Sequence, residues 1–153
     1  MHSSPKFLTF CFLVLTLAFV FCKDDNKQKE GSQQEQVDDS SAQMKEVMAI
    51  HDEVMPKMSE LNAMIVKLEA EVDSTTVRGQ EAAAIVLELQ DAYKSMMTWM
   101  KDFSQGFTTE EIMDGSELNE EKKQLLNQEE EKVRIVRDKI NGSLEKAKSF
   151  LDS

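Results

Sequence analysis

The stretch that decides the fold is MKEVMAIHDEVMPKMSELNAMIVKLE, residues 44–69. Its apolar side chains recur at alternating steps of three and four residues, which places them on one face of an α-helix. Pro56 removes one backbone hydrogen bond and crowds the preceding turn, yet the stripe keeps its phase on both sides. The pattern therefore predicts one amphipathic helix over residues 40–73, kinked near Asp52 to Pro56. Its face consists of two columns of a seven-residue repeat, Met44, His51, Met58, Ile65 and Val72 in one and Val47, Val54, Leu61 and Leu68 in the other.

Two further stripes predict two further helices, over residues 77–104 and 116–151. A turn is expected at residues 73–79 and a linker at residues 104–115, after which Ser116 is the expected N-cap. The second stripe comprises Ala82, Val86, Leu89, Tyr93, Met96, Met100 and Phe103, and the third comprises Leu118, Leu125, Leu126, Val133, Val136, Ile140, Leu144, Ala147 and Leu151.

These segments predict an all-α fold over residues 40–153: a three-helix antiparallel bundle, up-down-up, built of coiled-coil-like hairpins. The apolar register is the same before and after the first turn, so one continuous helix over residues 40–104 is the alternative. Such a helix would leave its stripe without a packing partner, which favours the turn. A thin, Met-rich core also leaves association of two copies open.

Residues 1–21 have the pattern of a secretory signal, in which a short start with one lysine precedes an apolar run. The run, residues 7–21, is shorter than the ~20 residues that a helix needs to cross the hydrocarbon core. It ends at Cys22, and a hydrophilic segment follows. This arrangement resembles the start of a bacterial lipoprotein, which implies an acylated (palmitate-type) Cys22. Residues 22–39 are then predicted to be a disordered tether, since they carry too little apolar surface to fold.

Phe21 departs from that resemblance, because lipoprotein signals normally carry a small residue before the cysteine. Two alternatives follow. Cleavage after Ala18 or Cys22 would release a soluble protein, and an uncleaved leader would act as an anchor helix.

Three segments also resemble a known family: MKEVMAIHDEVMPKM at residues 44–58, YKSMMTWMKDF at residues 93–103 and EEEKVRIVRDKINGSLEKAK at residues 129–148. They are similar to small helical lipoproteins of Bacteroidota that are often labelled "viral A-type inclusion protein". The Cys-Lys-Asp-Asp start at Cys22 resembles the signal that sends some lipoproteins of that group to the outer face of the outer membrane. The resemblance implies a cell-envelope lipoprotein of undetermined role, and it brings no catalytic residues.

The formal net charge of −11 limits the partners. So acidic a surface repels phosphate backbones, and we expect no nucleic-acid partner. The expected partners are the lipid bilayer, through acylated Cys22, and an unknown protein or a second copy of the chain. A nucleophile–base site needs a histidine near a serine or cysteine. The single histidine after the leader, His51, lies among methionines, so we predict a structural or interaction protein and no enzyme.

A row of soft ligands on the first helix is the sharpest local chemistry. Four thioethers and one imidazole at spacings of four and three residues lie along one helix side, a donor set that suits Cu(I). The same positions are core positions, where methionine fills irregular gaps, so a periplasmic copper-binding protein is the alternative to a protein without cofactor. This Met/His row comprises Met44, Met48, His51, Met55 and Met58.

Trp99 is the one large aromatic residue that could anchor a partner, since buried tryptophans often carry interface energy. The alternative is a tryptophan that packs in the bundle core, with its N–H bonded inside the protein.

Overall fold

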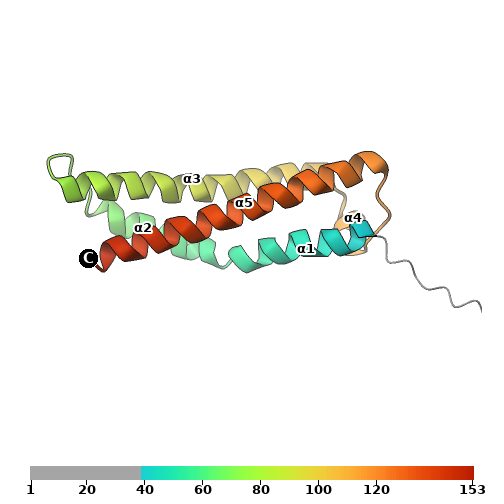
Figure 1. The fold of residues 1–153 in the computed structure, drawn as a ribbon, viewed down its shortest axis with the longest axis horizontal. Coiled ribbons are helices and arrows are strands. Elements are labelled where there is room, and N and C mark those ends of the chain that lie inside the picture. The colour runs from blue at the N-terminus through green and yellow to red at the C-terminus, as the bar shows by residue number, and fades with distance from the viewer. Residues whose placement is uncertain (1–38) are drawn as a thin grey trace, which may run out of the picture. The chain divides into compact units, whose positions relative to one another are not determined.

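The computed structural model describes residues 39–153, and there it contains five α-helices and no strand (Figure 1). The predicted leader, Cys22 and all but the last residue of the predicted tether lie outside the described residues. Within the described part, no helix is both long and apolar enough to cross a membrane. The all-α class is confirmed for this part. The helices are α1 (Asp39–Val54), α2 (Lys57–Glu69), α3 (Val77–Gly106), α4 (Thr109–Met113) and α5 (Glu120–Leu151).

The single helix expected over residues 40–73 is two helices, α1 and α2, that meet at Pro56. Proline has no N–H to continue the ladder, and it serves as the N-cap of α2 at φ −60° and ψ −27°. The backbone remains hydrogen-bonded on both sides of the break, because Met55 N donates to His51 O at 3.0 Å and Met58 N donates to Met55 O at 3.1 Å. Figure 1 shows α2 following α1 along α5, so the break bends the chain without reversing it.

α5 is the central packing element of the described residues, since it contacts α1, α2 and α3, while α3 also packs against α2. Its buried face follows strict steps of three and four residues, as a coiled-coil seam does. This seam consists of Leu126, Glu129, Val133, Val136, Ile140, Ser143, Ala147 and Phe150.

In the described residues, ion pairs at the surface also connect α5 to its neighbouring helices. Five pairs connect α5 to other helices, and in each of these the cation belongs to α5 and the acid to its neighbour. Exposed pairs add little stability individually, but together they favour one register of α5 against the other helices. They are Lys122–Glu111, Arg134–Glu46, Lys139–Asp91, Lys146–Glu88 and Lys148–Glu60.

The face that α3 buries differs from the predicted one. The column Ala82, Leu89, Met96 and Phe103 is buried as expected. In the second column Val86 is buried as expected, but Tyr93 is 40% exposed and Met100 is only partly buried. In their place the helix buries Ile85, Ala92 and Trp99.

The reversal between α2 and α3 occupies residues 70–76 and depends on side-chain oxygens. Asp73 Oδ1 accepts hydrogen bonds from the backbone N and the hydroxyl of Thr75 at 2.8 and 2.6 Å, and these bonds lower the Asp73 pKa. Thr76 is the N-cap of α3, and its Oγ1 accepts from Gly79 N at 3.0 Å. The turn folds so closely over α3 that a Cβ on Gly79 would lie 2.3 Å from the Asp73 carbonyl oxygen.

The predicted linker contains the short helix α4, which begins with a capping box. The Thr108 side chain accepts from Glu111 N, and the Glu111 carboxylate accepts from Thr108 N. Lys122 of α5 donates to the Glu111 carboxylate at 2.7 Å. Hydrogen bonds from Lys122 and from the Thr108 backbone lower the Glu111 pKa.

The third helix begins later than predicted. Asn119 is its N-cap, through a 2.9 Å hydrogen bond from Lys122 N, and Ser116 is not. The reason lies in the preceding residues: Gly115 takes a left-handed φ of 69° after α4. The chain then runs without helix to Leu118, whose side chain is buried.

Two glycine-to-alanine substitutions should move stability in opposite directions. At Gly79 the added methyl meets Asp73 backbone, so we expect Gly79→Ala to destabilise the protein by about 1–3 kcal/mol, as overpacking does. At exposed Gly142 in α5 no outside atom lies within 4 Å, so Gly142→Ala should stabilise by about 0.5–1 kcal/mol. Urea unfolding followed by circular dichroism measures both. A stabilised Gly79→Ala or a destabilised Gly142→Ala would contradict this account of the two positions.

Candidate functional site

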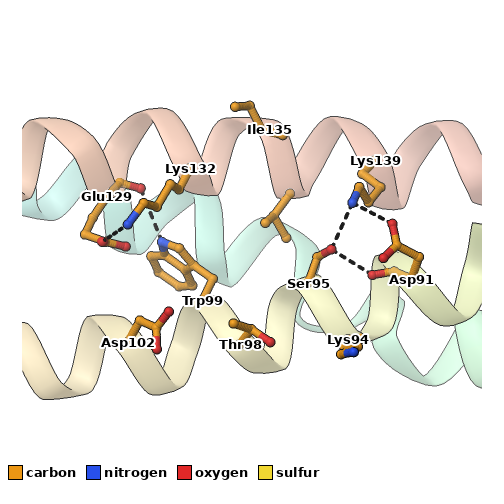
Figure 2. A pocket seen from close by; sticks show the side chains of 11 residues that line it. Asp91, Lys94, Ser95, Thr98, Trp99, Asp102, Glu129, Lys132, Ile135 and Lys139 are labelled. Carbon is orange, nitrogen blue, oxygen red and sulfur yellow. Dashed lines mark hydrogen bonds and ion pairs between the residues drawn. The ribbon is translucent and has the colours of Figure 1, made fainter.

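A groove of about 360 Å³ lies between α3 and α5 (Figure 2). Its walls come from one face of each helix, and the two ends differ in chemistry. We name the end that holds Trp99 and Glu129 the Trp/Glu end, and the end that holds Asp91 and Lys139 the Asp/Lys end.

At the Trp/Glu end, an aromatic ring and a carboxylate lie together below the surface. Trp99 is 4% exposed and Glu129 is 2% exposed. The indole Nε1 donates to the Glu129 backbone carbonyl at 3.2 Å, which fixes α3 against α5 here. Lys132 donates to Glu129 Oε1 at 2.7 Å, and Figure 2 shows this ammonium and the carboxylate beside the indole.

At the Asp/Lys end, the polar groups bond to one another. Lys139 donates to Asp91 Oδ2 at 2.7 Å and to Ser95 Oγ at 3.0 Å, and Ser95 in turn donates to the Asp91 backbone carbonyl at 2.7 Å. The hydrogen bond and positive charge of Lys139 lower the pKa of Asp91, with a further contribution from Lys94. Asp91 is therefore ionised at neutral pH and paired with Lys139. This ion pair holds α3 and α5 together.

Between these ends the groove has an apolar wall. Ile135 is 57% exposed and Val136 is 7% exposed, both on α5. Both residues line the same groove as Trp99 and give a ligand apolar surface to cover.

The Met/His row is placed along α1 and the start of α2, and its members differ in exposure. Met44 and Met58 are buried at 2% and 7%, so they pack in the core. Met48, His51 and Met55 are partly buried, at the border between core and solvent. The His51 Nδ1 lies 2.9 Å from Asp52 Oδ1, and its ring centroid lies 5.8 Å from that of Trp99.

A metal site made of histidine, cysteine or carboxylate ligands is a separate possibility from the Met/His row. Nowhere in residues 39–153 do three His, Cys, Asp or Glu side chains gather in a way that could hold a metal ion. This observation says nothing of thioether ligands.

Trp99 sits in an aromatic series on α3. Its ring stacks on Phe103 at a centroid distance of 4.9 Å, and Phe103 in turn lies 4.9 Å from Phe107. The burial of Trp99 is that of a core residue, although it also lines the groove. Its role as an interaction anchor stays a prediction.

Glu129 is the site residue that the sequence reasoning missed. An acidic run such as residues 120–131 is ordinarily a solvated helix face, but Glu129 is buried. The signal was present in the spacing, because Glu129 stands three residues after Leu126 and four before Val133, at a seam position. A charge at a seam position is the kind of local conflict that marks a functional or specificity role.

The groove thus offers apolar contact, a paired polar end and a buried carboxylate, a combination suited to binding. Comparison of the chain with protein-family models, with curated proteins and with solved structures gives no match.

Proposed function

We propose that the chain is a cell-envelope lipoprotein whose helical part, residues 39–153, is a non-catalytic binding module. Cys22 would carry the acyl chains, and the residues between Cys22 and α1 would be the tether. The observation that supports binding over turnover is the pairing of the groove's polar groups. Lys139 is engaged by Asp91 and Ser95, and Lys132 by Glu129, so these groups hold structure and are not poised as acid and base.

The anchor part of the proposal is supported by the sequence around Cys22. A cysteine directly after a 15-residue apolar run, followed by Lys-Asp-Asp, resembles a lipoprotein start of the outer membrane. Acyl chains contribute ~0.8 kcal/mol for each buried CH₂, so two or more chains would give stable anchoring.

We also propose that the module works as an up-down-up bundle of three arms, with α1 and α2 together as the first arm, α3 as the second and α5 as the third. The contacts of α5 with both α1 and α2 support this reading, as does the tight reversal between α2 and α3. Such a module would act through its outer surface on another protein or on a second copy.

Mass spectrometry of the N-terminus tests the anchor. In a bacterium that processes lipoproteins, we expect the chain to begin at Cys22 and to carry the mass of fatty acyl groups. Cys22→Ser should abolish both, whereas Cys11→Ser, the matched change inside the leader, should alter neither. An unacylated chain that begins at another residue would reject the anchor.

A soft-metal carrier is the second proposal, and the border position of Met48, His51 and Met55 supports it. These three side chains follow one another along one helix side at partial exposure, where an ion could reach them from solvent. Soft thioethers with one imidazole favour Cu(I).

An anaerobic Cu(I) competition titration tests that carrier. The wild type should bind more tightly than micromolar, and the double variant His51→Ala, Met55→Ala should bind at least about tenfold more weakly, since two ligands are lost. Met113→Ala removes an exposed thioether from α4 and should leave the affinity unchanged. Equal affinity in the double variant would eliminate the Met/His row as a copper site.

A further inference from the structure

Glu129 combines the position of a core residue with the chemistry of an ion. Its side chain is 3% exposed, and the residues before and after it on the seam, Leu126 and Val133, are fully buried. Oε1 accepts from Lys132 at 2.7 Å. Oε2 is buried and, within the described part of the chain, has no hydrogen-bond partner.

An unpaired carboxylate oxygen in the interior is unfavourable, because the water lost on burial is not replaced by a donor. The donors around it are engaged elsewhere. Trp99 Nε1 donates to the backbone carbonyl of Glu129, and Lys132 donates to the other carboxylate oxygen. A donor from outside the protein would satisfy Oε2 once the side chains that cover it move aside, because Oε2 has no exposed surface in the structure.

The surroundings select the kind of donor. The indole of Trp99 and the exposed side chain of Ile135 offer apolar surface to a ligand in the groove. Asp102 adds a second carboxylate near Trp99 in the same groove (Figure 2). The volume of about 360 Å³ is at the small end of ligand pockets. A small cation with an apolar stem fits these features, and an ammonium supplies three donors.

We infer that the Trp/Glu end of the groove is a binding site for a small primary amine, whose ammonium donates to Glu129 Oε2 and whose apolar stem lies against Trp99 and Ile135. Lys132 demonstrates the same chemistry within the chain, since its own ammonium and alkyl stem already reach Oε1. The site does not require the acyl anchor, so either proposal can fail alone.

Trp99 is the single tryptophan of the chain and therefore reports on its own groove. The full chain in non-ionic detergent is titrated with n-butylamine, with n-butanol and butyrate as matched neutral and anionic probes. We expect a saturable change in tryptophan emission at millimolar butylamine and none with the other two. Equal responses to butanol and butylamine would overturn the inference, because they would show apolar contact without recognition of the charge.

Glu129→Gln keeps the shape and removes the negative charge. Its affinity for butylamine should fall about tenfold or more, as expected when a charge-assisted hydrogen bond is lost. Glu131→Gln makes the same change at an exposed position two residues along α5 and should bind as the wild type does. Wild-type affinity in Glu129→Gln would overturn the inference.

A gain-of-binding variant separates recognition from misfolding. Lys132→Ala removes the internal partner of Glu129 and frees the space of its stem, so we expect a lower Tm that butylamine partly restores and butanol does not. Lys146→Ala breaks a comparable pair, with Glu88 at the other half of α5, and should show no such recovery. A Tm of Lys132→Ala that does not respond to butylamine would also overturn the inference.

Discussion

The packing of α5 against its neighbours is the constraint on which the described fold depends. α1 and α2 are separated by a proline, α4 is a single short turn, and α3 is joined to both sides through loops. α5 contacts α1, α2 and α3 along one seam and reaches α4 through the Lys122–Glu111 pair. Removing apolar surface from water drives this packing, while the cations of α5 and the acids of its neighbours favour one register.

The seam of α5 carries two polar residues, and they differ in how they are satisfied. Ser143 donates to the Ile140 carbonyl at 3.1 Å within its own helix, so its burial costs little. Glu129 has one oxygen bonded and one without a partner. A hydrophobic residue at position 129 would serve the packing better, because replacing buried ions by apolar groups is often stabilising. The seam therefore concentrates its energetic cost at one position, and that position borders the groove.

Features that depend on spacing within a few residues were predictable from the sequence, and features that depend on contacts between distant residues were not. Apolar steps of three and four residues correctly indicated helices, and they identified most of the buried residues of α1, α2 and α5. Local chemistry was also readable, since Pro56 bends the chain without reversing it. The groove was not predicted, because it is formed by side chains of α3 and α5 that are far apart in the chain, as Trp99 and Glu129 are.

The buried face of α3 shows a feature that apolar periodicity does not determine. Two columns flank the central column of Ala82, Leu89, Met96 and Phe103, and each pairs with it at helical spacing. One comprises Ile85, Ala92 and Trp99, and the other comprises Val86, Tyr93 and Met100. The sequence does not say which side meets a neighbour. Packing buries the whole column with Trp99, whose ring gains a hydrogen-bond partner on α5. Of the other column it buries Val86 and leaves Tyr93 partly in solvent.

By itself, then, the sequence determined that residues 39–153 form amphipathic helices and where most of them end, because these properties depend on spacings and caps within a few residues. Only the tertiary structure decided which flank of each stripe is buried and that a glutamate is enclosed beside a tryptophan. The physical reason is that a helix has the same period on every side, so the buried side is set by contacts with helices distant in the chain.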